Sequence, residues 1–302
     1  ARITGHLDDA RGLDQRPQAR AVPADATVRQ LVLLPSAPRS DLVRIHEAAA
    51  RFFQSQLPGS WVPGYLNGRG FGPAVQSFWQ AGYAPAECDA LTRHLRADGH
   101  PDTLIEAAGL ARPSRRGTLI DTFRDRAMLP IHSAGGTMVG FIGRAAEHAA
   151  SGVPKYLNTP RTDLYDKSSV LFGLWQGRAA LAQGAHPVIA EGPIDAIAVS
   201  AACPGRYVGL APCGTALTSR QVATLDEMAD LRVAGVLVAF DSDEAGQRAA
   251  VKAFRVLSPF TDRAEAVALP AGQDPAQTLN ERGRTALAET LAGRVRPLVD
   301  LV

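Results

Sequence analysis

The sequence predicts an α/β protein, in which an α+β N-terminal subdomain precedes a mainly parallel sheet with helices on both faces. Two observations support this prediction. From about residue 187 onward, short apolar runs of strand type alternate with segments of helical spacing, which is typical of parallel strands joined by crossover helices. Upstream, helical patterns are followed by two apolar strands around a glycine pair. With 302 residues, 46% of them hydrophobic, the chain can bury the cores of two domains.

The N-terminal half begins with a polar segment and continues with helices. Residues 1–38 are rich in Arg, Asp, Ala and Pro, so we expect a disordered or loosely attached arm. A helix is predicted from Ser40, with Ser40 or Asp41 as its cap and Leu57-Pro58-Gly59 as its end. The other elements expected upstream are short helices around 74–80, 87–97 and 101–108 and a hairpin of strands 127–132 and 137–142 across Gly135-Gly136.

The C-terminal part alternates between the two kinds of element. Strands are expected near residues 187–191, 206–211, 235–240 and 263–269. Helices are expected near residues 193–203, 218–230, 244–257 and 275–282.

Composition excludes several protein classes. The net charge of +2 does not give the strong positive field of a DNA-packaging protein. The three cysteines, Cys88, Cys203 and Cys213, form no CxxC pair, so we expect no zinc site, no disulfide framework and a reducing compartment. No apolar run reaches the length of a membrane span and no signal-peptide pattern is present, so we expect a cytoplasmic protein without membrane contact. Because the chain begins with Ala, we expect a segment of a longer protein.

Acidic residues follow the apolar strands of the C-terminal part. Glu191 and Asp195 come after one strand, Asp241 and Asp243 after another, and Asp274 after a third. Carboxylates at the carboxyl ends of neighbouring parallel strands converge in one crevice, where open α/β sheets bind ligands. Such carboxylates repel one another unless a cation neutralises them, and Mg²⁺ suits carboxylates and substrate phosphates. The pattern indicates a site with two or more divalent ions, Mg²⁺ or Mn²⁺, for phosphoryl or nucleotidyl transfer.

Simpler interpretations exist for single residues. Asp243 could cap the helix that begins at Glu244, and Glu191 and Asp195 could share a solvated helix face. Other site types fit less well. No G-x-x-x-x-G-K-[ST] loop accompanies Asp241, no H-E-x-x-H motif occurs, and the glycines of segment 68–72 lack both the dinucleotide-binding spacing and a preceding strand.

The acidic pattern resembles the TOPRIM signature of primases, topoisomerases and some nucleases. Further motifs upstream, in the same order, resemble the catalytic core of bacterial DnaG-type primases from about residue 42 to residue 292. These motifs are Tyr65-Leu66-Asn67-Gly68-Arg69-Gly70, Phe78 with Gly82-Tyr83-Ala84-Pro85, the run 123–131, Gly140-Phe141-Ile142-Gly143-Arg144 and the run 154–160.

The resemblance implies a DNA-directed RNA polymerase that makes short RNA primers on single-stranded DNA from ribonucleoside triphosphates. It implies a primase-type N-terminal basic subdomain over 39–185, a TOPRIM domain over 186–270, and the end of that domain with C-terminal helices over 271–302. Metal ligands would be Glu191, Asp195, Asp241, Asp243 and Asp274. The residues assigned to catalysis are Glu191, Asp241, Asp243 and Lys155. Phosphates of nucleotides or template would be held by Arg69, Arg144 and Lys155.

The chain departs from the family pattern at two positions. Pro193 replaces a residue that is usually aromatic, and proline is tolerated in the first turn of a helix. Ala276 stands where the family usually has a second aspartate, which predicts a weaker second ion and activity that is low or biased toward Mn²⁺. The family's zinc-binding and helicase-binding domains have no counterpart in the sequence, so contact with a replicative helicase would use regions not present here.

Two alternative functions remain open at this point. A TOPRIM nuclease or other phosphotransferase would use the same carboxylates, but the upstream motifs count against it. A catalytically degenerate module that binds single-stranded DNA or a partner has Ala276 as its main support, and the intact acidic set from Glu191 to Asp274 counts against it. Template contact would need exposed cations, and the candidates are Arg112, Arg115, Arg116, Arg124 and Arg126.

Overall fold

The computed structural model describes residues 34–214, 216–241, 243–293 and 295–301. Nearly all of the arm expected over 1–38 therefore lies outside the described residues. Within the described ranges, no helix has both the length and the apolar character needed to cross a bilayer.

Helix α1 (Arg39–Gln56) is the first element and confirms the helix predicted from Ser40. Its apolar side, which includes Leu42, Ile45 and Phe53, is buried and packs on strands β1 and β5. The expected cap is wrong, because Pro38 occupies the N-cap position and Ser40 lies inside the first turn. Proline suits this place because it fixes the backbone and because the first helical N–H groups have no intrahelical partner.

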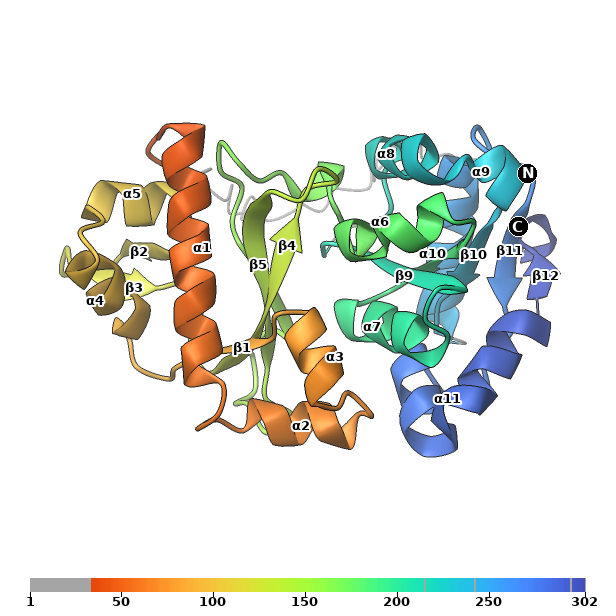
Figure 1. Cartoon of the computed structure of the whole chain (residues 1–302), viewed down its shortest axis with the longest axis horizontal. Coiled ribbons are helices and arrows are strands. Elements are labelled where there is room, and N and C mark those ends of the chain that lie inside the picture. Colours follow the sequence, from red (N-terminus) through yellow and green to blue (C-terminus); the bar gives the residue numbers. More distant parts are fainter. Residues whose placement is uncertain (1–33, 215, 242, 294, 302) are drawn as a thin grey trace, which may run out of the picture. The chain divides into compact units, whose positions relative to one another are not determined.

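A four-stranded sheet follows in the order β1-β4-β5-β6, and helix α1 packs on it (Figure 1). The predicted hairpin is confirmed as β4 (Arg126–His132) and β5 (Met138–Ala145), which pair antiparallel. The short strands β1 (Gly82–Ala84) and β6 (Tyr156–Asn158) were not predicted. The register places Tyr156 of β6 opposite Arg144 of β5, which matters for the site described below.

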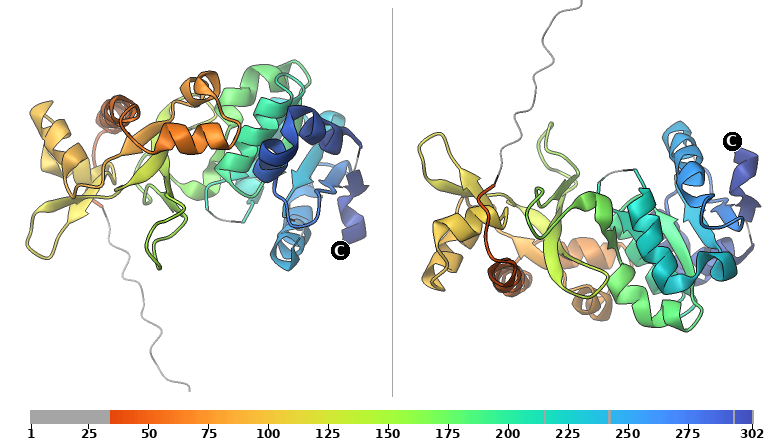
Figure 2. Two further views of the ribbon diagram at one scale, coloured as in Figure 1. Left: turned by 90° about the horizontal axis from the view of Figure 1, so that it is seen from below. Right: turned by 90° about the horizontal axis from the view of Figure 1, so that it is seen from above.

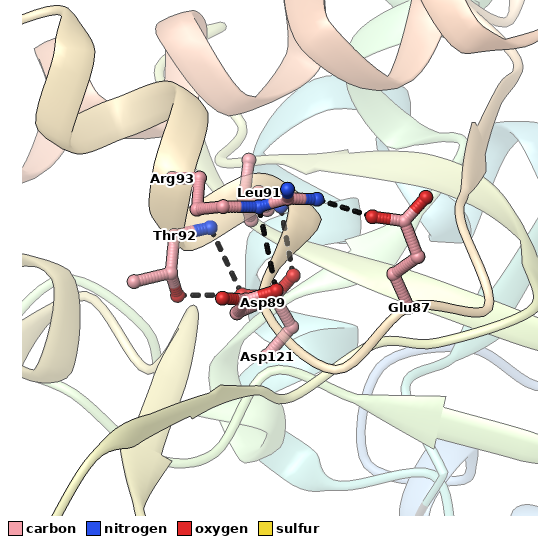
Figure 3. Close-up of polar contacts among 6 residues, drawn as sticks. All are labelled: Glu87, Asp89, Leu91, Thr92, Arg93 and Asp121. Atoms are coloured by element: carbon pink, nitrogen blue, oxygen red, sulfur yellow. Dashed lines mark hydrogen bonds and ion pairs between the residues drawn. The ribbon is translucent and has the colours of Figure 1, made fainter.

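Small elements complete the N-terminal part. They are α2 (Val62–Gly68), α3 (Pro73–Phe78), α4 (Ala90–Ala97), α5 (Asp102–Ala107), β2 (Ala111–Pro113) and β3 (Leu119–Asp121). Asp121 is buried, and its carboxylate accepts hydrogen bonds from the backbone N–H groups of Leu91 and Thr92 and from the Thr92 hydroxyl (Figure 3). A side chain from β3 thus satisfies the first turn of α4, so a distant residue caps this helix.

A six-stranded sheet forms the C-terminal part, in the order β12-β11-β10-β8-β9-β7. Its strands are β7 (Leu171–Phe172), β8 (His186–Ala190), β9 (Tyr207–Pro212), β10 (Val236–Ala239), β11 (Ala264–Val267) and β12 (Val295–Pro297). Strands β8 to β11 pair in parallel, while β7 and β12 are antiparallel edges. The predicted mainly parallel sheet is therefore confirmed, with its four central strands close to the expected ranges.

Helices cover both faces of this sheet, as predicted. The elements are α6 (Leu174–Ala182), α7 (Pro193–Ala202), α8 (Ser219–Ala229), α9 (Leu231–Ala234), α10 (Glu244–Leu257), α11 (Pro275–Gly293) and the 3₁₀ turns η1 (Lys167–Ser169) and η2 (Leu298–Leu301). One face packs against α7 and α11, and the other against α6, α8 and α10. Adjacent residues of β8 point to opposite faces, as the two-residue period of a strand requires. Val188 belongs to the core that contains α7 and α11, and Ile189 to the core that contains α6, α8 and α10.

The strand order contains a reversal at β8. From β8 the chain crosses through α7 to β9, and from β9 it returns through α8 to β10 on the opposite side of β8. Helices α7 and α10 consequently lie on different faces of the sheet. The carboxyl ends of β8 and β10 flank a topological switch point, the place where open α/β sheets bind ligands.

Candidate functional site

Two carboxylates lie directly at the switch point. Glu191 follows the last residue of β8, and Asp241 follows β10 by two residues. Because β8 and β10 pair in register at Ala190 and Ala239, these side chains are neighbours. The backbone N–H of Asp241 donates a hydrogen bond to Glu191 Oε1 at 3.2 Å. Glu191 precedes α7 by two positions, so the alternative in which it shares a helix face with Asp195 is wrong.

The first turns of α7 and α11 bring in two more carboxylates. Asp195 lies in the first turn of α7, which begins at Pro193, so proline is accommodated there as expected. The backbone N–H of Ala276, in the first turn of α11, lies 3.4 Å from Asp195 Oδ1. Asp274 precedes α11, and its Oδ1 accepts a hydrogen bond of 2.6 Å from the N–H of Gln277. The close packing of α7 on α11 therefore places Asp195 beside Asp274.

Asp243 caps a helix and also lies close enough to the other carboxylates to act on them. It is the N-cap of α10, where its Oδ1 accepts a hydrogen bond of 2.8 Å from the N–H of Gly246. It also acts electrostatically on Glu191 and Asp241, since its charge raises the pKa of both. The structure therefore brings all five predicted carboxylates to one sheet edge, and we call Glu191, Asp195, Asp241, Asp243 and Asp274 the acidic edge.

Burial and mutual repulsion raise the pKa values of three carboxyls in the acidic edge. Burial, followed by the charge of Asp274, raises the pKa of Asp195 to about 7. Burial and neighbouring carboxylates also raise the pKa values of Glu191 and Asp241. The Lys155 ammonium opposes the shift at all three carboxyls, so it lies near enough to act on each of them. A group of carboxylates that resists ionisation is one that a bound cation would stabilise.

The carboxylates of the acidic edge do not converge on a single point. Among the described residues, no three His, Cys, Asp or Glu side chains are close enough to form a ready-made metal site. Mg²⁺ is usually held by one or two carboxylates together with water and substrate phosphates. The donor set, made only of carboxylate oxygens with raised pKa values, fits ions of this kind whose remaining ligands come from the substrate.

Three cations face the acidic edge, and we call Arg69, Arg144 and Lys155 the cationic wall. Arg144 on β5 is buried, with 6% of its surface exposed, and Lys155 immediately precedes β6. The guanidinium groups of Arg69 and Arg144 lie 5.3 and 5.2 Å from the ring centroid of Tyr65. Tyr156 stacks with Arg144 at 5.5 Å and lies 5.8 Å from Lys155 Nζ. Two tyrosine rings therefore fix the positions of the wall.

Two groups in the wall have no hydrogen bond of good geometry within the described residues. They are the Nε of Arg144 and the hydroxyl of Tyr65, and both are buried. A buried donor without a partner is rare in folded proteins and often marks a ligand site or a water site. The Arg144 guanidinium and the Tyr65 hydroxyl lie within reach of each other, so an anion at this place would compete only with that contact.

Residue Glu147 belongs to this site but was not predicted. Its Oε1 lies 2.7 Å from Arg69 Nη2 and 3.9 Å from Arg144 Nη2. The Arg69 hydrogen bond, with the charges of Arg144 and Lys155, holds the pKa of Glu147 below its usual value. Glu147 follows strand β5 in a segment without periodicity, so no sequence signal could have identified it.

Tyr156 was also missed as a site residue. Burial, and then the charge of Asp195, raise its pKa well above the ordinary value. A side chain added at Gly192 would come within 3.5 Å of the Tyr156 hydroxyl, which shows that this ring lies against the start of α7. Its position next to Lys155 in the sequence was the available signal.

The candidate template cations fall into two groups. Arg112, Arg115 and Arg116 are exposed on the β2–β3 hairpin, drawn in yellow, which projects from the N-terminal elements in both views of Figure 2. Arg124 is exposed as well. Arg126 is buried, and its Nη1 donates to the carbonyl oxygens of Gly143 and Pro154 at 3.0 Å each. The prediction for Arg126 is therefore wrong, because its guanidinium joins β5 to the loop before β6.

Comparisons with known proteins agree with this architecture. Residues 52–178 match the family model of the DNA primase catalytic core, N-terminal domain, and residues 188–279 match a Toprim-like domain. The chain is 36% identical over 261 residues to the DNA primase of Streptomyces coelicolor, and 34% identical over 254 residues to that of Deinococcus radiodurans. It covers 40% and 43% of those proteins, and 85% and 84% of its own length is aligned.

Solved structures with the same fold include primase domains. The RNA polymerase domain of Mycobacterium tuberculosis primase DnaG superimposes with a TM-score of 0.79 at 34% identity, covering 87% of this chain and 86% of that one. A DnaG primase catalytic domain bound to single-stranded DNA superimposes with a TM-score of 0.75 at 27% identity, covering 87% and 84%. The similarity includes the N-terminal part as well as the sheet that carries the acidic edge.

Proposed function

The chain belongs to the family of DnaG-type DNA primase catalytic cores, and from this membership we propose that it synthesises short RNA primers on single-stranded DNA. The proposed activity is that of a DNA-directed RNA polymerase of primase type. The observation that carries the proposal is the closeness of the cationic wall to the acidic edge, with Lys155 acting on three of the carboxylates and Asp274 acting on Arg69.

Each side of the crevice has its own part in the proposed reaction. Glu191, Asp195, Asp241, Asp243 and Asp274 would hold two or more divalent ions, Mg²⁺ or Mn²⁺, which when bound supply charge neutralisation at the reacting phosphate. Lys155 would place its ammonium beside the same phosphate. With Glu191, Asp241 and Asp243, it forms the set to which we assign catalysis. The 3′-oxygen of one nucleotide bonds to the α-phosphorus of the next, and pyrophosphate leaves.

Arg69 and Arg144 would hold the phosphates of the incoming nucleotide or of the template. The Nε of Arg144 supports this role, because it is a buried donor without a hydrogen bond of good geometry, beside the Tyr65 hydroxyl. Glu147 now occupies these arginines, so a phosphate would have to replace its carboxylate. Phosphoryl transfer depends mainly on positioning and on charge neutralisation, and this arrangement supplies both.

Single-stranded DNA is the proposed template. The bound single strand in the related DnaG catalytic domain supports this proposal, as do the exposed arginines of the β2–β3 hairpin. The nuclease alternative has less support, because the N-terminal match over 52–178 is to a primase domain.

A primer synthesis assay tests the proposal. The chain is incubated with single-stranded DNA, labelled ribonucleoside triphosphates and either Mg²⁺ or Mn²⁺, beside an Asp241→Asn variant that differs only in one charge. We expect short RNA products from the parent and a loss of about a thousandfold in the variant, since metal ions supply several kcal/mol to the transition state. Products from both proteins at equal rates would contradict the assignment of the acidic edge.

A further inference from the structure

A second crevice opens beside the acidic edge, on the face of the sheet that carries α10. It has a volume of about 380 Å³ and is bordered by Glu191, by Pro212 at the end of β9, by residues 216 and 217 after that strand, and by one side of α10. Phe240, which follows β10, also lines it, so the crevice lies at the carboxyl ends of three adjacent strands. We call it the α10 crevice.

Two cations of α10 line this crevice. Arg248 and Lys252 are four residues apart, so they lie on the same helix side, about 6 Å apart along the axis. Both are exposed. Arg248 pairs with Glu244, itself 85% exposed, and Lys252 has no ion pair or hydrogen bond within the described part of the chain. The rest of the lining is largely apolar, with Leu217 and Phe240 among its members.

The position of these cations relative to the acidic edge is informative. Helix α10 begins at Glu244, next to Asp243, and runs away from the sheet edge. Arg248 and Lys252 are therefore about one and two turns, or about 6 and 12 Å, further along the helix than the acidic edge. Anionic groups held by them would be near the reaction but clear of the ions that the carboxylates would bind.

An enzyme that starts a chain must hold two nucleoside triphosphates at once. One reacts at its α-phosphorus and loses pyrophosphate, so its phosphates must reach the metal ions. The other supplies the 3′-oxygen, gives its hydroxyl proton to solvent and keeps its own triphosphate intact. That second triphosphate needs a cationic place outside the metal cluster, and a stacking or apolar surface for its base.

We propose that the α10 crevice binds the initiating nucleotide, with Arg248 and Lys252 contacting its uncleaved triphosphate. The proposal rests on the proposed function and adds a second nucleotide position to it. The cationic wall serves the reacting phosphates beside α7 and α11, while the α10 crevice serves the intact triphosphate on the other face. The apolar lining around Phe240 and Leu217 would cover the base.

The test separates initiation from extension. An Arg248→Gln/Lys252→Gln double variant is compared with Arg255→Gln, which removes an exposed cation from the last turn of the same helix, outside the crevice. We expect the double variant to need roughly tenfold more nucleotide for dinucleotide formation, the equivalent of about 1.4 kcal/mol. Extension of an annealed RNA primer with a 5′-hydroxyl should change less than about twofold. A Lys252→Arg variant should keep initiation.

Two results would overturn the proposal: an equal loss in initiation and extension, or weaker binding of single-stranded DNA with unchanged use of nucleotides. A separate measurement covers the case in which the parent makes no RNA and the proposed function itself fails. Inorganic triphosphate is then titrated calorimetrically into each protein. Weaker binding to the double variant than to Arg255→Gln supports the crevice, and equal binding rejects it.

Discussion

The acidic edge and the cationic wall face each other but are built in different ways. Local backbone features place each carboxylate: Glu191 and Asp241 follow neighbouring parallel strands, and Asp195, Asp243 and Asp274 lie at helix starts. The wall depends on contacts between distant segments. Tyr65 lies between Arg69 and Arg144, and the β5–β6 register brings Tyr156 to Arg144.

The two sides also differ in how their charge is balanced. The acidic edge lacks sufficient positive charge, so burial and repulsion raise the pKa values of its carboxyls. The wall is partly neutralised by Glu147, whose pKa is lowered. One side therefore gains from a cation and the other can exchange a carboxylate for a phosphate. A complex of a divalent ion with a nucleotide would supply the cation to the acidic edge and the phosphate to the cationic wall.

A large effect, second to that of Asp241→Asn, is expected at Asp243, where charge and helix capping can be separated. Asparagine is as good an N-cap as aspartate, so Asp243→Asn keeps the α10 cap and removes the charge, whereas Asp243→Ala removes both. We expect both variants to lose at least about a hundredfold in primer synthesis, because a metal ligand is lost.

Stability distinguishes the two variants. Only Asp243→Ala should show a lower free energy of unfolding, by about 1 kcal/mol in urea titrations. Full activity in Asp243→Asn would mean that this residue only caps α10.

A pH effect is expected at His46 in α1. Burial lowers its pKa from the ordinary 6.5 to about 4, so the folded protein keeps it neutral. Its contribution to stability is complete above pH 6.5 and is lost as pH falls toward 4, because the unfolded chain takes up the proton first. At pH 5 the loss is about 2 kcal/mol. Burial gives His132 a pKa of about 4 as well, and it adds to the loss in the same direction.

Urea unfolding at pH 7, 6 and 5 measures this loss. In a His46→Phe variant the ring can still stack near Phe141, and the pH dependence should be smaller by the share of His46, while the shares of His132 and His186 remain. His46→Gln serves as a second variant if the first is unstable. An unchanged slope in both variants would show that other groups control acid sensitivity.

A smaller effect is expected at Lys155. Because Lys155 is assigned to catalysis, Lys155→Gln should lower kcat as well as raise the KM for nucleotides roughly tenfold, the latter corresponding to about 1.4 kcal/mol of lost phosphate interaction. Because the ammonium also opposes repulsion within the acidic edge, divalent-ion affinity of the variant should not fall. Lys167→Gln is a matched change in the η1 turn. A KM increase of the same size in Lys167→Gln would show that the effect comes from the loss of any positive charge and not from the position of Lys155.

The smallest effect is expected at Glu147. Glu147→Gln removes the charge that competes for Arg69 and Arg144, so nucleotide affinity should rise about threefold, in line with a surface ion pair of under 1 kcal/mol. Fluorescence titration of a labelled nucleotide measures it. Lower affinity would mean that Glu147 positions the arginines rather than occupying their phosphate site.

The sequence was sufficient to predict the residues of the acidic edge, because these carboxylates lie at strand ends and helix starts. Hydrophobic periodicity indicates both kinds of position. For the wall, the family resemblance pointed to Arg69, Arg144 and Lys155, but the residues that contact them were missed. Glu147 and Tyr156 reach the site through the β5–β6 pairing, and β6 has only three residues. Asp121 caps α4 from thirty positions away along the chain, as the hydrogen bond to Leu91 shows. Arg126 was misassigned because a buried and an exposed arginine have the same appearance in sequence.

The central claim is that the acidic edge binds divalent ions and that the cationic wall does not contribute to that binding. Mn²⁺ titration followed by electron paramagnetic resonance tests it directly, with and without ATP, on the parent, Asp241→Asn and Arg144→Gln. We expect Mn²⁺ binding in the parent and in Arg144→Gln, tighter binding in the parent when ATP is present, and binding weakened at least about tenfold in Asp241→Asn. Mn²⁺ binding that Asp241→Asn leaves unchanged, or that Arg144→Gln abolishes, would contradict it.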